Sequence, residues 1–480
     1  MQMMRGGPTY MNQIRIERYP RLVLGINVFL LICIVYYLYR VLLDPGNIDI
    51  SPLLIVIAAL VPGYLWAKGR RSGLPILPLH TFALTWAFAL PLVAGHPKIK
   101  IYTHDEIFFA ALSVALYALF ATASWYFVTR MGYKVRKSYY VIPERHGYRF
   151  FIIALVLGGV FIKMVVGGIV NLDPGVFAIV RSSILSFMAI AIFVLAYQMG
   201  RGEFSRFKKA TFVIAAIFSV IMQLTTLYMI GAITSTSIAL VGYAVGRRQI
   251  PWTGILVTIL IFGILQAGKY EIRERYSFLN PRPITLVEIP ELIVNWVEAG
   301  VSDIFTEKGE QIQSNPIYQR VSLIHLLLFV QRASPRDIPY LDGATYRIIP
   351  SVIIPRIFNP DKPSPHTGTR ILNIHYGLQT EQGTLQTTIG WGIVNEAYAN
   401  FGLEGIIAVG FVIGLIFGLV GRWTAGAPIM SFENLVGVTF ITIAIQTENT
   451  MGVLTAVLFQ SLVVLILVVP LLVKRSIHIG

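Results

Sequence analysis

The chain has 480 residues, of which 55% are hydrophobic and only 13% are charged, and its formal net charge is +15. This composition excludes an ordinary soluble globular protein. Apolar runs recur that reach the roughly 20 residues needed to cross about 30 Å of hydrocarbon as a helix. Backbone polar groups find no water there, so helices are the expected spanning form. The sequence therefore predicts an all-α integral membrane protein.

Cysteine usage and charge exclude other classes. Cys33 is the single cysteine, so we expect neither a disulfide framework nor a cysteine-based metal site. The first apolar run is too long for a signal-peptide core and lacks a small-residue cleavage site, so it is expected to remain as a helix. The basic residues lie mostly in short loops between apolar runs, which is typical of topology signals, and we expect no nucleic-acid partner.

The apolar runs predict about twelve transmembrane helices. The seventh and eighth runs meet closely around Gly231, Thr234 and Ser235, so they are alternatively a broken or re-entrant pair. The predicted spans are residues 21–43, 52–67, 74–94, 107–129, 151–171, 178–199, 210–229, 231–246, 252–268, 388–421, 428–446 and 451–473.

Charges between these runs predict the orientation. Basic clusters follow the even-numbered spans and also occupy both tails, whereas Lys98 and Lys100 form the one exception. The positive-inside rule then predicts cytoplasmic termini. Residues 269–387 are the one long segment expected on the outside of the membrane. The predicted organisation is 1–268 with spans one to nine, 269–387 as an extracytoplasmic loop domain, and 388–480 with spans ten to twelve.

The long outer segment is predicted to be ordered. Residues 284–299 carry apolar side chains at helical spacing with glutamates opposite, which suits an amphipathic helix at the membrane surface. Residues 316–331 predict a second helix. The seven prolines between residues 335 and 365 exclude a regular helix and favour an ordered loop.

Basic side chains of the outer segment are the first functional candidates. The guanidinium fork matches phosphate oxygens, so a basic outer surface suits a diphosphate or another anionic head group. Pairing with lipid phosphates or local carboxylates is the alternative, and charge alone does not separate the two. Lys269 and Arg273 share one helical face where the ninth span ends. The later basic residues are Arg320, Arg332, Arg336, Arg347, Arg356, Lys362 and Arg370.

Glu396 and the outer histidines are candidates for proton transfer. Glu396 lies about two turns inside the tenth apolar run, where an unpaired carboxylate is costly. We expect arginines of the outer loop as its partners, either in a catalytic site or in a structural pair that clamps the loop. His325 and His375 supply imidazoles that accept a proton when neutral, although a lone histidine is more often a hydrogen-bonding residue.

Missing motifs limit the chemistry. The sequence has no phosphate-binding loop of the G-x-x-x-x-G-K-[ST] type and no zinc-type histidine spacing. It also lacks the paired acidic residues in the first outer loop that metal-dependent multi-pass glycosyltransferases carry, and Asp105 next to Glu106 is a weaker pattern. We therefore expect metal-independent chemistry without a cofactor.

Ordered fragments recur between residues 269 and 405. They are K-Y-E-I-R at 269–273, P-Y-L-D-G-A-T-Y at 339–346, I-P-R-I-F-N-P-D-K-P at 354–363, Y-G-L at 376–378, T-T-I at 387–389 and N-E-A-Y-A-N-F-G at 395–402. With these fragments in this order, residues 269–405 resemble the bacterial O-antigen polymerases, also called oligosaccharide repeat-unit polymerases, and the related O-antigen ligases. Asn359 stands where the family pattern suggests an aromatic residue.

The resemblance implies a GT-C-like membrane glycosyltransferase of polysaccharide biosynthesis. Such an enzyme polymerises O-antigen or exopolysaccharide repeat units, transferring a glycan from undecaprenyl diphosphate to an acceptor repeat unit at the outer face of the bacterial inner membrane. The resemblance thus implies that the segment 269–387 is periplasmic. A flippase and a chain-length regulator of the same pathway would be partners. The matching cationic positions are Arg273, Arg320 and Arg356, helped by Lys269 and Lys362. Glu396 is the first choice as base or base-positioning residue, with His325 or His375 second.

Other functions remain open at this stage. An O-antigen ligase uses the same donor but transfers to a lipid A core, and the sequence hardly separates it from a polymerase. A lipid-linked glycan transporter or flippase is expected to show internal repeats and polar groups near the midplane. We find no repeat, and charge is sparse through the first eight spans. A scaffold in a polysaccharide assembly complex is the third alternative.

Overall fold

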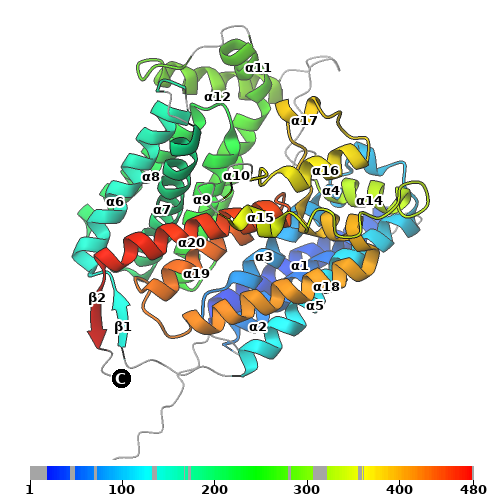
Figure 1. Ribbon diagram of the computed structural model, residues 1–480, viewed down its shortest axis with the longest axis horizontal. Coiled ribbons are helices and arrows are strands. Elements are labelled where there is room, and N and C mark those ends of the chain that lie inside the picture. The colour runs from blue at the N-terminus through cyan, green and yellow to red at the C-terminus, as the bar shows by residue number, and fades with distance from the viewer. Residues whose placement is uncertain are drawn as a thin grey trace, which may run out of the picture.

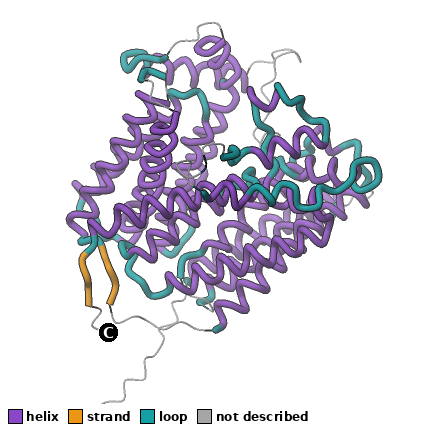
Figure 2. The backbone as a smooth tube through the Cα atoms, viewed as in Figure 1, coloured by secondary structure: helices purple, strands orange, loops and turns teal. Residues whose placement is uncertain are grey.

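The structure, a computed structural model, is a bundle of helices joined by short loops at one end and by a long folded segment at the other (Figures 1 and 2). It describes residues 19–43, 49–69, 73–131, 138–166, 168–170, 174–278, 283–305, 322–354, 359 and 362–477.

The first half of the chain supplies most of the bundle. Two π-helical turns adjoin these helices: Thr85–Ala89 lies between α3 and α4, and Ile162–Val166 follows α6. A separate 3₁₀ turn, Pro97–Ile99, lies between α4 and α5. The helices are α1 (Pro20–Leu43), α2 (Ser51–Ala67), α3 (Ile76–Leu84), α4 (Leu90–Val93), α5 (His104–Arg130), α6 (Glu144–Phe161), α7 (Pro174–Arg201), α8 (Arg206–Leu224), α9 (Met229–Arg247) and α10 (Trp252–Ala267).

The second half contains the outer segment and the last long helices. A small antiparallel sheet pairs β1 (Ser138–Val141) with β2 (Lys474–Ile477) near the end of the chain. The helices are α11 (Lys269–Arg273), which runs into a π turn (Glu274–Phe278), α12 (Ile289–Phe305), α14 (Ile324–Ala333), α15 (Ile349–Ile353), α16 (Thr367–His375), α17 (Gly383–Gln386), α18 (Gly392–Thr424), α19 (Phe432–Ala444) and α20 (Met451–Leu472).

Helix length and apolarity support the multi-span prediction. Within the described residues nine helices are long and apolar enough to cross a membrane, or ten if the bent pair α10–α11 counts as one span. The predicted spans 52–67 and 428–446 are helices of 17 and 13 residues, shorter than the usual spanning length. The chain is therefore a helical protein of the membrane-embedded kind, and nine or ten of the twelve predicted spans have full spanning length within the described residues.

The seventh and eighth predicted spans are two separate helices. A tight turn at Leu227, with φ of 60°, reverses the chain between α8 and α9. Gln223 of α8 then donates to and accepts from the Ser235 hydroxyl of α9, at 3.0 and 3.1 Å between side-chain atoms. The alternative of a broken pair at this position is wrong. The bend occurs instead between α10 and α11, where the axes differ by 55°.

Small residues allow the closest helix contacts. Gly410, Gly414 and Gly418 of α18 pack on α5, so this glycine spacing joins helices within one chain. A Cβ atom on Gly414 would lie 2.0 Å from the Ala121 carbonyl oxygen. Close backbone approach of this kind is how helices associate in lipid, where burial of apolar surface supplies little driving force.

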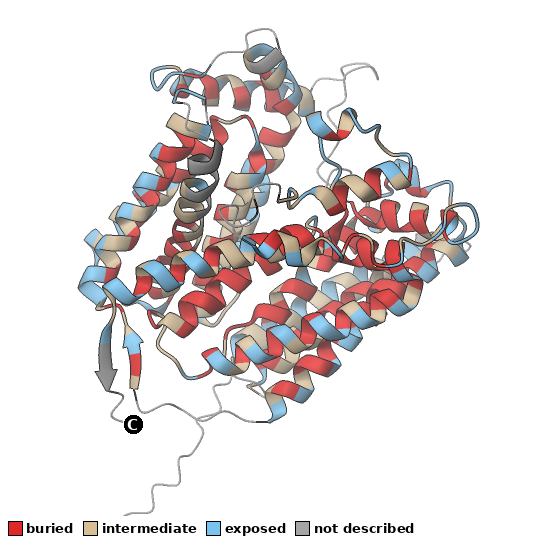
Figure 3. Ribbon diagram, in the orientation of Figure 1, coloured by how far each residue is buried: buried red, intermediate tan, exposed pale blue. Residues whose placement is uncertain are grey.

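Apolar side chains also cover the outer faces of the bundle. Leu256 and Leu260 of α10 are 65% and 64% exposed, and Leu24 of α1 is 63% exposed. Figure 3 shows exposed residues along the outward sides of the helices and buried ones where the helices meet. Such exposure is costly in water, so these faces suit a surrounding of lipid chains.

The outer segment folds back on the bundle in two places. The predicted helix at 284–299 is α12, which packs with α8, α9 and α10 in a small core of its own around Trp296. The predicted helix at 316–331 is α14, which begins at Ile324; residues 316–321 lie outside the described part of the chain. α14 to α17 lie over the opposite half of the bundle, at the right in Figure 1.

A charged clamp holds α14 to α5. The Arg332 guanidinium donates to both oxygens of Glu106, at 2.6 and 2.7 Å, and to the Ile101 carbonyl at 3.0 Å. Its plane also lies over the Tyr102 ring, 4.0 Å from the centroid. Hydrogen bonding to Glu106 raises the pKa of Arg332 further above its usual range, so the clamp stays charged. Arg332 is thus paired with a local carboxylate.

The α5–α18 contact gives a direct test. Valine at Gly414 forces the two helices apart, because its Cβ would overlap the Ala121 carbonyl. Overpacking of this kind costs about 1–3 kcal/mol. We expect Gly414→Val to lower the melting temperature of the detergent-solubilised protein. Gly263→Val is the matched control, because a Cβ at Gly263 of α10 meets no heavy atom within 4 Å; equal melting temperatures for the two variants would contradict the packing account.

Candidate functional site

A break in α18 organises the site. Phe401 and Gly402 leave helical geometry, with φ of −143° and 63°. Because of this break, the carbonyl groups of Ala399 and Asn400 lose the N–H groups of the next helical turn that would otherwise donate to them. The outer loop supplies replacements: the Leu341 N–H donates to the Ala399 oxygen at 3.0 Å, and the Asp342 N–H donates to the Asn400 oxygen at 3.2 Å. Backbone groups buried at this depth require such partners.

Aromatic contacts complete this junction between loop and helix. The Tyr340 hydroxyl lies so close to Gly402 that a Cβ there would approach it to 2.7 Å. Gly402 is therefore required both by its positive φ and by the neighbouring tyrosine. The Tyr346 ring stacks on Phe401 with centroids 6.0 Å apart. The fragments 339–346 and 395–402, which were far apart in sequence, form one interlocked unit.

Glu396 lies at the centre of this unit and is completely buried. Its Oε2 accepts a hydrogen bond of 2.6 Å from the N–H of Met451, the first residue of α20. A carboxylate at a helix N-terminus is favoured by the helix dipole and by the free N–H groups there. The expected arginine partner is wrong for the described part of the chain, because the carboxylate is held by α20 and faces the Thr345 side chain instead.

Several buried polar atoms around Glu396 lack a hydrogen-bond partner. Asn400 donates to the Thr345 hydroxyl at 2.9 Å, and Asn395 donates to the Leu323 carbonyl at 3.0 Å. The unpartnered atoms are Oε1 of Glu396, Oδ1 of Asn395, Oδ1 of Asn400 and Oη of Tyr346. We call residues Thr345, Tyr346, Asn395, Glu396 and Asn400 the Glu396 cluster. Buried polar groups rarely remain unpaired, so the cluster can bind water or the polar groups of a ligand.

Tyr346 supplies a neutral hydroxyl to this cluster. Burial, together with the nearby Glu396 carboxylate, raises the pKa of Tyr346 far above its ordinary value of 10.0. The phenol therefore stays protonated and remains a hydrogen-bond donor at any physiological pH.

His375 lies at the edge of the same unit. Its Nε2 is 2.8 Å from the Pro339 carbonyl oxygen. A carbonyl only accepts, so Nε2 carries the proton and Nδ1 keeps its lone pair. The ring is half-buried and packs edge-on against Tyr376, whose hydroxyl pairs with Ser334 at 2.8 Å. The structure thus brings His375 and Glu396 to the same loop, residues 339–346.

His325 lies elsewhere, at the start of α14. It stacks on His96 with centroids 4.9 Å apart, and its Nδ1 pairs with the Ser322 hydroxyl at 2.9 Å. Burial lowers the pKa of His325 to about 4, and the neighbouring His96 and Lys98 lower it in the same direction. The ring is therefore neutral near pH 7 and a weak base. Its contacts fit a packing residue that joins the 322–325 segment to the end of α4.

Lys269 and Arg273 belong to the other half of the outer segment. Both lie on α11, which packs on α10 and α12. The Arg273 guanidinium lies over the Tyr228 ring, 5.1 Å from its centroid, and Lys269 is buried with a polar partner of its own. α11 belongs to the small core around Trp296, whereas the residues that flank Glu396 in α18 belong to the larger core of the bundle.

The remaining predicted cations differ in status. Arg320 and Arg356 lie outside the described residues. Lys362 is half-buried and engaged in a polar contact. Arg336 and Arg370 lie beside acidic neighbours: Arg336 pairs with the adjacent Asp337 at 2.8 Å, and Arg370 lies 4.0 Å from Glu381. Local carboxylates therefore account for part of the basic surface.

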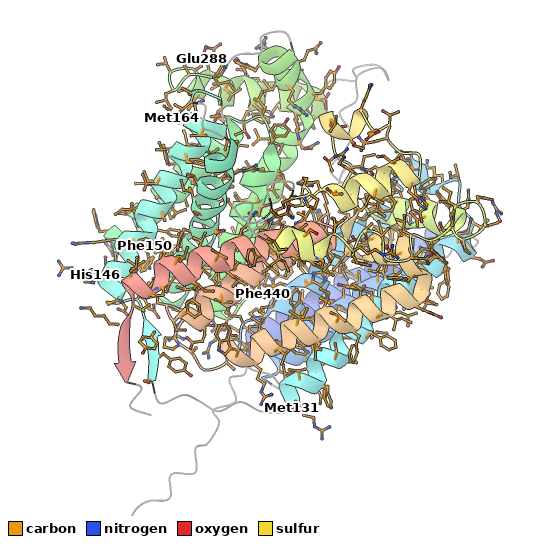
Figure 4. The ribbon with its side chains drawn as sticks, viewed as in Figure 1. Met131, His146, Phe150, Met164, Glu288 and Phe440 are labelled. Atoms are coloured by element: carbon orange, nitrogen blue, oxygen red, sulfur yellow. The ribbon has the colours of Figure 1, made fainter. Side chains whose placement is uncertain are left out.

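Two cations inside predicted spans were missed as candidates. Lys163 is buried in the π turn of α6 and contacts the Ile284 carbonyl, which leads into α12. Figure 4 places the neighbouring Met164 and the acidic Glu288 at the same end of the molecule. Arg181 of α7 lies near His366, and burial together with this charge lowers the pKa of His366. The sequence could have identified both, because each is a charged residue within a predicted span.

Comparison with models of known protein families, with curated proteins and with solved structures finds no match for this chain. The fold and site define a helical membrane-embedded protein with a folded outer segment. Among the described residues no group of three histidine, cysteine, aspartate or glutamate side chains could hold a metal ion.

The cap on α20 gives a test of the role of Glu396. Alanine at Glu396 leaves the Met451 N–H without an acceptor, which costs about 1–3 kcal/mol before the cavity is counted. Glutamine keeps an oxygen at the same place. We expect Glu396→Ala to lower the melting temperature well below that of Glu396→Gln. Glu404→Ala, at an exposed site on the same helix, is the control. Equal values for all three variants would contradict the capping role.

The pKa of His325 predicts a pH effect on stability. Its folded-state pKa of about 4 lies below the ordinary value of 6.5. As the pH falls from about 6.5 towards 4, His325 binds a proton in the unfolded chain but not in the folded chain, so the folded state loses stability in this pH range. Between pH 7.5 and 4.5, we expect the melting temperature of His325→Gln to fall by less than that of the wild type. His146→Gln, an exposed site, should behave as wild type does; identical pH profiles for all three proteins would refute the assignment.

Proposed function

We propose that the chain is a polysaccharide repeat-unit polymerase of the GT-C-like, O-antigen polymerase type, with twelve spans in a bacterial inner membrane. Both termini are cytoplasmic and the segment 269–387 is periplasmic in this proposal. The enzyme transfers a glycan from undecaprenyl diphosphate to an acceptor repeat unit, independently of metal. A flippase and a chain-length regulator of the same pathway are its partners.

One observation carries the proposal. The fragments 339–346 and 395–402, on which the family resemblance rests, lie against each other and enclose unpartnered polar atoms at the junction of bundle and outer segment. A transferase for a lipid-linked glycan needs polar groups at this boundary, because the donor has a polyprenyl tail in lipid and a polar sugar outside it. Of the other fragments, 376–378 begins with Tyr376, which packs against His375, and 269–273 packs in the separate core around Trp296.

The roles follow from the contacts. His375 is the general base, because Nδ1 has a lone pair and Nε2 is fixed by the Pro339 carbonyl. Glu396 is a positioning residue, because it is buried and holds α20 against α18. The role of the cations follows from the family resemblance instead: Lys269, Arg273, Arg320, Arg356 and Lys362 bind the diphosphate and stabilise it as the leaving group.

The reaction balances without a further reactant. The acceptor hydroxyl attacks the anomeric carbon of the donor glycan, and the bond from that carbon to the diphosphate oxygen breaks. The hydroxyl proton passes to His375, and undecaprenyl diphosphate leaves with the bonding electron pair. A preorganised cationic surface lowers the barrier because negative charge grows on the leaving oxygen.

The test is glycan chain length in cells that lack the gene and carry plasmid-borne variants. We expect His375→Gln and Arg273→Gln to leave single repeat units or short chains, with losses of about 10²-fold or more for the base. Arg275→Gln is the matched control for Arg273→Gln, two residues further on at an exposed position. If Glu396 positions the loop, the Glu396→Gln variant should still produce long glycan chains. If Glu396 is the base, this variant should leave only single repeat units or short chains. Membrane levels of every variant are measured in parallel.

The outcomes separate the alternatives. Glycan that no longer reaches the lipid core in the deletion strain would indicate a ligase. Repeat units retained at the cytoplasmic face would indicate a flippase. Normal chains in well-expressed His375→Gln and Arg273→Gln variants would overturn the residue roles, and normal chains in the deletion strain would overturn the polymerase itself.

A further inference from the structure

An open, shallow cavity lined by arginines lies at the end of the bundle where α1 begins and α7 and α9 end. Its volume is about 390 Å³, and its walls are Arg21, Gly200, Arg201, Gly246 and Arg247. The charge pattern of the sequence predicts that this end is cytoplasmic. None of the residues assigned to glycan transfer lines this cavity, so the proposed transfer does not explain it.

Glycine contacts bring two of these arginines together. A Cβ on Gly200 would lie 2.5 Å from the Tyr243 carbonyl oxygen and 2.9 Å from the backbone nitrogen of Arg247. A Cβ on Gly246 would lie 2.2 Å from the Tyr197 carbonyl oxygen. The backbones of α7 and α9 therefore touch where they end, and Arg201 and Arg247 both line the cavity. Positive charges that line one cavity repel each other, and an anion between them relieves this repulsion.

Contacts from α1 add further positive charge. Arg21 donates to the Gln249 side chain at 3.3 Å, and the Arg248 guanidinium lies over the Tyr19 ring, 5.0 Å from its centroid. These contacts fasten the start of α1 to the end of α9. Glu203 pairs with Arg201, with 3.2 Å between its Oε1 and Nε of Arg201, and both side chains are more than one third exposed. Solvent screens such a pair, so this contact is weak.

Two simpler explanations account for part of this arrangement. Cations at the last turn of α7 and α9 interact favourably with the helix carbonyl ends. Basic residues on this side also set membrane orientation. Neither effect requires that glycines press the two helix ends together, that a third arginine comes from α1, or that a cavity remains between them. The oxygens of a phosphate group can accept hydrogen bonds from guanidinium groups that line one cavity.

We propose that this cavity binds the phosphate group of an anionic phospholipid and that the bound headgroup joins α1, α7 and α9. The lipid source is favoured because the cavity lies at the ends of membrane-spanning helices, at the level where headgroups are found. Its acyl chains would lie along α1, whose large apolar side chains are exposed. The site is independent of the polymerase reaction and holds whatever the catalytic function of the chain.

The experiment measures lipid binding to the full-length protein purified in a neutral detergent. Phosphatidylglycerol, phosphatidylcholine and inorganic phosphate are added separately, and melting temperature and retained lipid by native mass spectrometry are recorded. We expect phosphatidylglycerol to stabilise the wild type and remain bound. The double variant Arg201→Gln/Arg247→Gln should bind it about tenfold more weakly or worse, as expected from loss of charged hydrogen bonds.

Matched variants keep the test decisive. Arg206→Gln removes a charge on the same side of the membrane but outside the cavity, and it should bind as wild type does. Arg201→Lys/Arg247→Lys keeps the charges, so it should fold and retain part of the affinity even if the glutamine variant does not fold. Equal binding by the lysine, glutamine and wild-type proteins would overturn the site. Equal stabilisation by phosphatidylcholine would also overturn it, and stabilisation by inorganic phosphate without retained lipid would overturn the lipid source.

Discussion

Helix breaks in this bundle leave backbone and polar groups that have no water partner inside a membrane, and the outer segment supplies partners for them. The break at Phe401 in α18 is closed by the N–H groups of Leu341 and Asp342. The π turn in the third predicted span leaves the Ala87 carbonyl to accept from the Leu323 N–H at 2.9 Å. The π turn of α6 contains Lys163, which contacts the Ile284 carbonyl. Because irregular backbone is tolerated at this depth only when protein satisfies it, the outer segment and the bundle depend on each other.

This dependence explains which features the sequence could predict. Hydropathy located every long helix and the two outer helices α12 and α14, since apolar length and helical spacing are properties of a continuous stretch. The helix breaks are stabilised by groups that are distant in sequence. No local sequence pattern therefore predicted the contact between Leu341 and α18. Glu396 was singled out correctly as a buried carboxylate, but among the described residues its partner is a peptide N–H and not the expected arginine. A peptide N–H at the start of α20 has no sequence signature, whereas an arginine is visible.

The interrupted helices also change the comparison with a transporter. Sparse charge in the first eight predicted spans argued against a conduit, yet Lys163 is buried in one of them and Arg181 lies in another. Discontinuous helices occur in transporters as well as in enzymes that act at the membrane surface. The interruptions here are filled by a folded segment of the same chain, at the outer end of the bundle. Polar groups gathered at that end suit a substrate whose polar part lies outside the lipid.

Burial decides how the Glu396 cluster could take part in transfer. A base must reach the proton it accepts within hydrogen-bond distance, and a completely buried carboxylate already bonded to a helix N-terminus does not. Its effect passes instead through what it holds in place: α20, the Thr345–Tyr346 loop and, through that loop, the Pro339 carbonyl that orients His375. The tyrosine hydroxyl and the two asparagine oxygens keep unused hydrogen-bonding capacity at this point. The cluster therefore combines a rigid support with polar atoms that still lack partners, which is the arrangement a polar substrate at the membrane boundary requires.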